Sequence, residues 1–220
     1  QATRPRELFS WDIKYLPTLV LGIYYYLYLF MDIFSRKIVG HEVHETESME
    51  KSSNLIENIC IVENIQRNQI ITHADNGSPK KGCTMLVTLQ RLGIVPSFSR
   101  PGVSNDNAYS ESLFKTMKYG HTYPSKPFQS LEKTRDWVKG FVDWYNNDHL
   151  HSGISFTTPN SRHEGEDLEI LKRRHAVYQE AQEQHPSRWS GKTRNWEKMN
   201  TVDFHGLKVI RNFVRPNDVG

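Results

Sequence analysis

The fold is decided by residues 8–44, which read LFSWDIKYLPTLVLGIYYYLYLFMDIFSRKIVGHEVH. Residues 8–16, 19–33 and 37–44 are rich in aromatic, β-branched and leucine side chains, and Pro17 and the Ser35-Arg36 pair separate them. This composition, bounded by a proline and a polar turn, is typical of strands. Because the connections are short, the three predicted strands should form an antiparallel meander.

The rest of the chain alternates helices with single short strands. Helical spacing predicts helices over residues 48–66, with Ser48 as N-cap, and over 81–92. Short strands are predicted over residues 70–72 and 94–98, and the helical crossovers make them parallel. Further helices are expected from Asn105 or Asp106 to Tyr119, over 131–145 and over 168–184. The chain is therefore predicted to be α/β, and its element order resembles the ribonuclease H-like fold, a mixed five-stranded sheet of meander and parallel strands flanked by helices.

Composition bounds the function loosely. The chain has 220 residues and a net charge of +3, which suits one domain with a tail and permits a nucleic-acid partner without requiring one. Its two cysteines, Cys60 and Cys83, belong to no metal-spaced pair and indicate a reducing compartment. The apolar run over residues 19–31 is shorter than the roughly 20 residues of a membrane helix, so no membrane association is expected.

Three acids stand out by their positions: Asp12 within the first predicted strand, Asp75 directly after the fourth, and Glu111 in the helix after the fifth. A lone carboxylate in an apolar strand is costly to bury unless a cation compensates it. Taken singly, each acid has an ordinary explanation, as an edge-strand residue, a turn former or a solvated helix residue. Together, on neighbouring elements, they predict a site for two Mg²⁺ ions about 3.5–4 Å apart, which Mn²⁺ could replace.

Two other acids compete for this role. Asp32 lies beside the first strand, and a pairing with Arg36 is the simpler expectation for it. Asp106 precedes Glu111 by five residues and is predicted to cap the helix. No serine or tyrosine is expected to have the base partner that a covalent nucleophile needs.

The chain spacing sharpens the hypothesis, because 35 residues separate Asp75 from Glu111. The neighbouring sequence resembles the D-D-35-E catalytic cores of retroviral integrases and of bacterial insertion-sequence transposases, over about residues 8–160. The segments that carry the resemblance are Trp11-Asp12-Ile13, Asp32-Ile33-Phe34-Ser35-Arg36-Lys37-Ile38-Val39-Gly40, His73-Ala74-Asp75-Asn76-Gly77-Ser78, Ser99-Arg100-Pro101-Gly102, Asp106-Asn107-Ala108, Glu111-Ser112, Trp144-Tyr145-Asn146-Asn147 and Thr158-Pro159.

The resemblance implies that Asp12, Asp75 and Glu111 are catalytic metal ligands in a bacterial, cytoplasmic DDE transposase. The implied reaction is phosphodiester hydrolysis at the ends of the element, followed by transfer of the new 3′-hydroxyl into target DNA. Two alternatives are a plain nuclease of the same fold and a non-catalytic DNA-binding or assembly protein descended from a transposase. The sequence of residues 100–118 disfavours a plain nuclease, and the presence of all three acids disfavours a non-catalytic protein.

DNA contacts are expected from four residues. Lys115 and Lys118 follow Glu111 at i+4 and i+7 and share its helix face, where they could hold phosphates; a solvated ion pair with Glu111 is the ordinary alternative. Arg100 and Asn107 are further expected DNA contacts. The working complex is expected to be a homo-oligomer, with element ends recognised by an upstream helix-turn-helix module or a separate chain.

The chain is predicted to divide into a lead-in over residues 1–7, the catalytic core over 8–160 and a helical tail over 161–220. The tail contains Trp189 and Trp196 among basic residues. It could grip DNA or a second subunit, or it could simply pack on the core.

Overall fold

The computed structural model describes residues 1–75, 82–100, 104–120 and 122–204. Its centre is a five-stranded sheet in the order β3-β2-β1-β4-β5. The strands are β1 (Leu8–Pro17), β2 (Tyr24–Asp32), β3 (Ile38–His44), β4 (Ile71–Ala74) and β5 (Val95–Phe98). The first three pair antiparallel, whereas β4 is parallel to both β1 and β5. The predicted meander followed by parallel strands is confirmed.

The second strand begins five residues later than the composition predicts. The hairpin closes with backbone bonds from Thr18 N to Ile23 O and from Ile23 N to Val20 O, and Gly22 adopts a φ of 83°. The apolar side chains before Tyr24 therefore point outward, and Leu21 is fully exposed. Apolar composition alone could not distinguish this turn from the strand that follows it.

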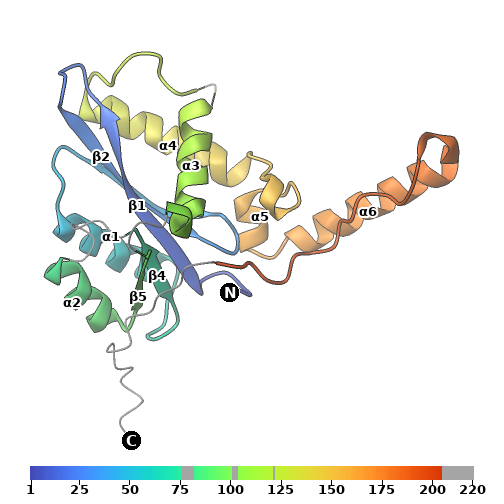
Figure 1. Ribbon diagram of the computed structural model, residues 1–220, viewed down its shortest axis with the longest axis horizontal. Helices are drawn as coiled ribbons and strands as arrows, with labels where there is room; N and C mark the ends of the chain where they lie inside the picture. Colours follow the sequence, from blue (N-terminus) through green and yellow to red (C-terminus); the bar gives the residue numbers. More distant parts are fainter. Residues whose placement is uncertain (76–81, 101–103, 121, 205–220) are drawn as a thin grey trace, which may run out of the picture.

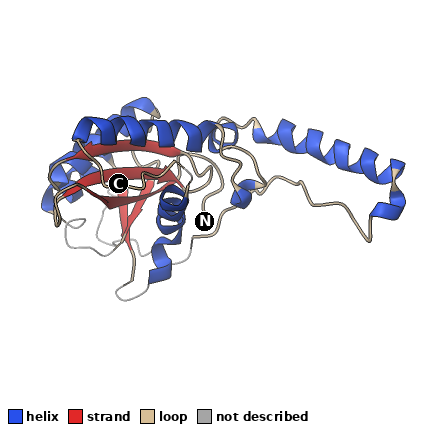
Figure 2. Cartoon of the chain, turned by 90° about the horizontal axis from the view of Figure 1, so that it is seen from above, coloured by secondary structure: helices blue, strands red, loops and turns tan. Residues whose placement is uncertain are grey.

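Helices cover both faces of the sheet (Figures 1 and 2). On one face, α1 (Met49–Val62) and α2 (Cys83–Leu92) bury residues such as Ile56 and Met85 against Phe9 and Phe30. The other face carries α3 (Ala108–Tyr119) and α4 (Leu131–Asn147), whose apolar residues form a second core.

The predicted helices are confirmed, with shifted ends. The Ser48 hydroxyl accepts a hydrogen bond from Glu50 N, so this N-cap is confirmed. The helix ends at Val62, four residues before the predicted end. The predicted start of the next helix, at residue 81, lies outside the described residues, and the described helix begins at Cys83.

Residues beyond the core form an arm. After the short helices η3 (Ser152–Ile154) and α5 (Pro159–His163), the helix α6 (Asp167–Gln184) projects away from the sheet, and the chain returns along it through η4 (Pro186–Arg188) (Figure 1). Only Asp167 and Leu171 of α6 are buried. Among the described residues, no helix combines the length and apolar character needed to cross a membrane.

Candidate active site

Asp12 and Asp75 lie at the same end of the sheet because their strands are parallel neighbours. The register of β1 and β4 ends with Trp11 opposite Ala74, and each acid is the next residue along its own strand. Both side chains are half-buried. The adjacency of the first and fourth strands brings these two backbone positions next to each other.

Glu111 reaches this end of the sheet on α3, whose first turn is hydrogen-bonded to β1. The Ser10 hydroxyl donates to Asn107 Oδ1 at 2.7 Å and lies 2.7 Å from Ser110 Oγ. Ser10 and Asp12 share one face of β1, because side chains two positions apart in a strand point the same way. The helix therefore lies over the face that carries Asp12. Glu111 directly follows Ser110, and its side chain is exposed.

The structure brings the three elements together without assembling a metal site. Within the described ranges, no three His, Cys, Asp or Glu side chains stand close enough to hold a metal ion. The donor set nevertheless suits a hard cation, because carboxylate oxygens are the ligands that Mg²⁺ prefers.

The Asp32 carboxylate is buried and forms no ion pair with the Arg36 guanidinium, so that prediction is wrong; the two residues share only a backbone bond, from Arg36 N to Asp32 O. Its carboxylate accepts hydrogen bonds from the backbone N–H of Arg6 and from both the N–H and the hydroxyl of Ser35. Burial raises the pKa of Asp32. The Arg36 guanidinium instead donates to Ile33 O and lies over the ring of Tyr109. Asp32 thus orders the β2–β3 turn.

Asp106 does not cap α3, so that prediction is also wrong. The N-cap is Asn107, which makes no side-chain capping bond. The Asp106 carboxylate accepts three hydrogen bonds from Arg100, one from its backbone N–H and two from its guanidinium. These bonds lower the pKa of Asp106 to about 2. Asp106 and Arg100 are six residues apart in the chain. Helix-capping preferences give no indication of such a pair.

The predicted DNA contacts differ in their availability. Lys115 and Lys118 are exposed on α3, and within the described part of the chain neither forms an ion pair with Glu111. The Arg100 side chain is 56% exposed and engaged with Asp106. Asn107 is 4% exposed, so its carboxamide would have to leave Ser10 to reach a phosphate. The two lysines are therefore the better placed members of the predicted set.

His73 was missed in the sequence, although it stands two residues before Asp75. It is buried in β4, and its ring nitrogens lie 3.0 Å from Ser97 Oγ and 3.2 Å from Ser99 Oγ. Burial lowers the pKa of His73 to about 4. The histidine therefore links the end of β4 to β5, next to the predicted metal ligand.

A serine with a base partner does exist, contrary to the expectation. Ser35 Oγ lies 2.9 Å from His163 Nδ1, and His163 Nε2 lies 2.9 Å from Glu63 Oε2. Ser35 is 0% exposed, and its hydroxyl already donates to Asp32. No substrate can reach this hydroxyl, so the arrangement is structural.

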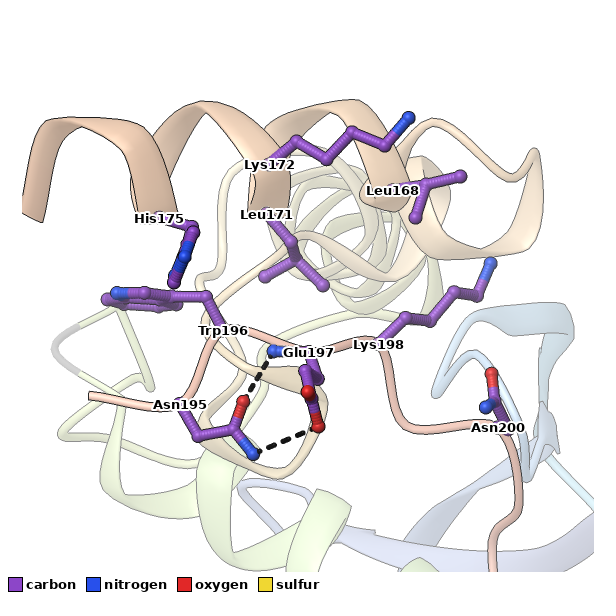
Figure 3. A pocket seen from close by; sticks show the side chains of 9 residues that line it. All are labelled: Leu168, Leu171, Lys172, His175, Asn195, Trp196, Glu197, Lys198 and Asn200. Atoms are coloured by element: carbon purple, nitrogen blue, oxygen red, sulfur yellow. Dashed lines mark hydrogen bonds between the residues drawn. The ribbon is translucent and has the colours of Figure 1, made fainter. Parts of the chain in front are cut away.

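A hollow lies in the arm, away from the predicted site. It has a volume of about 530 Å³ and opens between α6 and the returning segment, with Leu171 and Trp196 as its apolar lining (Figure 3). Of its lysines, Lys198 pairs with Asp167 and Lys172 pairs with Glu169. None of the predicted site residues lines it.

The strand order, the mixed pairing and the helices on both faces define a ribonuclease H-like fold. In this structure the three acids of the D-D-35-E spacing come from β1, from the end of β4 and from α3. The class of protein is thus the catalytic core found in integrases and transposases.

Comparison with known proteins identifies the family. Two family models, each described as an integrase core domain, match residues 2–104 and 92–159. The transposase for insertion sequence element IS904 of Lactococcus lactis is 31% identical over 159 residues, which are 72% of this chain and 62% of that protein. The putative transposase InsK for IS150 of Escherichia coli is 26% identical over 159 residues, 72% of this chain and 55% of that protein. The chain belongs to the integrase core domain family, among relatives that are insertion-sequence transposases.

The matched segment spans between about half and three fifths of these curated relatives. Solved structures agree on the fold. The simian T-cell lymphotropic virus intasome in complex with a PP2A regulatory subunit superimposes with a TM-score of 0.60 at 14% identity, over 74% of this chain and 56% of that chain. The trimeric form of the HTLV-2 integrase catalytic core domain in complex with magnesium superimposes with a TM-score of 0.55 at 14% identity, over 74% of this chain and 99% of that chain.

Proposed function

We propose that this chain is the catalytic core of an insertion-sequence transposase, which hydrolyses phosphodiesters at the element's ends and transfers the new 3′-hydroxyl into target DNA. The observation that carries the proposal is the parallel register of β1 and β4, which sets Asp12 beside Asp75 under the first turn of α3. Family membership supports it.

Asp12, Asp75 and Glu111 would hold two Mg²⁺ ions, or Mn²⁺ in their place. When bound, such ions lower the pKa of the attacking water or hydroxyl and stabilise the leaving oxygen. The chain's own residues supply the rest. The bond from Ser10 to Asn107 fixes α3 over the site, and closure of Glu111 onto the two aspartates fits the tightening of such sites when substrate binds.

The substrate side of the proposal rests on Lys115 and Lys118. Both project from the exposed face of the helix that carries Glu111, so a duplex held by its phosphates along α3 would present its backbone to the three acids. Recognition of the element's ends is assigned to a module outside this core, and the working complex to an oligomer.

The decisive experiment replaces Asp75 with Asn and Asp136, an exposed acid on α4, with Asn as the matched control. With Mg²⁺ or Mn²⁺ and duplex DNA, Asp75→Asn should cut at least about a thousandfold more slowly, since it loses several kcal/mol of charge stabilisation. The melting temperature should stay the same or rise, because clustered carboxylates repel one another without metal. Metal-dependent cutting by Asp75→Asn at the wild-type rate would contradict the proposal.

Two further readouts separate the alternatives. Titration calorimetry with Mn²⁺ tests the ligand set without any DNA, and binding should be lost in Asp75→Asn but kept in Asp136→Asn. A supercoiled target added to the cutting reaction should yield joined products. Cutting without joining would indicate a plain nuclease, and DNA binding without cutting would indicate a non-catalytic assembly protein.

A further inference from the structure

The segment that returns from the arm packs on the core beside the elements that carry the acids. Val202 pairs with Ala2 through two backbone hydrogen bonds, of 2.9 and 2.8 Å. The side chains of Val202 and Phe204 are buried, with 3% and 7% exposure. Residues 201–204 therefore pack on the core as a defined segment, which is called the strap here.

The strap contacts both elements that carry the acids. The Phe204 ring stacks on Tyr109 at 5.5 Å with an interplanar angle of 23°, and it meets the His73 ring edge-on at 4.6 Å. The Tyr109 hydroxyl donates to Asp203 O at 2.6 Å. Tyr109 precedes Glu111 by two residues in α3, and His73 precedes Asp75 by two residues at the end of β4.

Both rings that receive Phe204 are already anchored elsewhere. The Arg36 guanidinium lies 4.0 Å from the centre of the Tyr109 ring, and Arg36 is held in turn by Ile33 O. The His73 ring is hydrogen-bonded to the hydroxyls of Ser97 in β5 and of Ser99 just after it. The Phe204 ring therefore bridges two anchored rings, one on α3 and one on β4.

Resting on the proposed function, we propose that Asp203 and Phe204 are positioning residues of the active site. They hold the first turns of α3 against β4, and they thereby set the distance that Glu111 must cover to join Asp75 on a metal ion. Neither residue touches the reacting atoms. Since the strap directly follows the returning segment of the arm in the chain, it connects the arm to the elements that carry the acids.

The test compares three full-length variants. Phe204→Ala removes the ring that spans Tyr109 and His73, and Tyr109→Phe removes only the hydrogen bond to Asp203 while keeping both rings. Trp189→Ala is the matched control, because its ring contacts Tyr178 within the arm. Hydrogen exchange of the α3 amides over residues 108–112 is measured well below the melting temperature.

Exchange in α3 should accelerate about three- to tenfold in Phe204→Ala, by less in Tyr109→Phe, and not at all in Trp189→Ala. The Mn²⁺ concentration for half-saturation should rise in the same order, and kcat for cutting should fall with KM for DNA unchanged. Phe204→Tyr, which keeps the ring, should restore wild-type exchange.

Faster exchange confined to residues 201–204, or equal effects in Trp189→Ala, would overturn the proposal and leave the strap as surface packing. The exchange readout needs neither metal nor DNA. If wild-type protein fails to cut DNA, the proposed function falls while the exchange result still decides whether the strap positions α3.

Discussion

At the scale of single residues, the surroundings of Lys115 and Lys118 decide between two roles for these side chains. The sequence left open a solvated ion pair with Glu111 as their role. In the described part of the chain that ion pair is not formed, and all three side chains are exposed. The Lys118 ammonium lies over the ring of Tyr119 instead, at 5.6 Å from its centre. Two exposed cations on the helix of a proposed catalytic acid favour phosphate contacts.

Changing Lys115 and Lys118 together to Ala should weaken DNA binding for every duplex sequence. Each lost phosphate contact should also make the salt dependence shallower by about one unit of slope. Fluorescence anisotropy over a range of salt concentrations measures both effects. The control is the double change of Arg67 and Arg91 to Ala, which removes the same charge from exposed positions on the opposite, α1–α2 side. A slope equal to that of the control would count against phosphate contacts.

At the scale of elements, a buried ionic network joins the β2–β3 turn, α1 and α5. Glu63, at the C-terminal cap of α1, accepts from Arg6, Lys37 and His163, and it is 6% exposed. Burial opposes ionisation of this carboxyl, but the hydrogen bond and charge of His163 and the charge of Lys37 outweigh it and lower the pKa of Glu63 to about 2. The network therefore stabilises the fold only while Glu63 is ionised.

This network predicts a loss of stability in acid. Because the folded pKa of Glu63 is below its ordinary value of 4.5, its contribution is complete above about pH 4.5 and disappears as the pH falls toward 2. The shift corresponds to about 3 kcal/mol. Urea unfolding at pH 7, 5 and 3 should show Glu63→Gln less stable than wild type at pH 7 by about that amount, with the gap narrowed to roughly half or less at pH 3.

Glu57→Gln is the control for this measurement, because Glu57 pairs with Arg91 on the surface. It should change stability by less than about 1 kcal/mol at any pH. Burial also raises the pKa of Asp32, so the pH dependence of the wild type has more than one source. The difference between wild type and Glu63→Gln is therefore the quantity that reports on Glu63. A gap that stays constant from pH 7 to pH 3 would show that folding does not shift the pKa of Glu63, and would contradict the prediction.

At the scale of the whole molecule, the arm is held by very few buried side chains. Trp196 of the returning segment is 7% exposed and lies edge-on to Tyr178 of α6 at 5.2 Å, with the guanidinium groups of Arg174 and Arg194 over its ring. Tyr178 also meets the half-buried ring of Trp189, and Gln179 and Gln182 donate to Thr193 Oγ1 and Gly191 O. Near the base, Asp167 accepts from Arg162 and Lys198. Trp196 is therefore the main buried side chain that holds the outer half of α6.

Replacing Trp196 with Ala should unfold the outer arm and spare the core. Loss of a buried tryptophan costs about 3–5 kcal/mol, more than the few other contacts of this region can offset. Limited trypsin digestion should cut around Arg173 and Arg174 much faster, while the fragment containing the sheet persists. Trp189→Ala, at a less buried ring of the same arm, should digest like wild type. Simultaneous loss of arm and sheet would show that the arm is not an independent unit.

The sequence by itself determined the order and type of the elements, the position of Ser48 as an N-cap, and the three acids at their spacing. These features depend on side-chain periodicity and capping within a few residues, or on a resemblance spread along the chain. The tertiary structure alone decided which groups meet. Ser10 bonds to Asn107 across 97 residues, Tyr109 to Asp203 across 94, and Ser35 to His163 across 128.

The same distinction explains the errors at Asp32 and Asp106. Each was assigned a plausible local role, but a buried carboxylate accepts from the donors that the fold places nearest. Asp32 accepts from the backbone N–H of Arg6. Asp106 accepts from the backbone N–H and the guanidinium of Arg100. Desolvation makes such a partner obligatory without specifying its position in the chain. The packing of the sheet and helices therefore decided which hydrogen-bond partners form and where the strap and the arm lie. Only packing brings donors and acceptors that are distant in the chain within reach of one another.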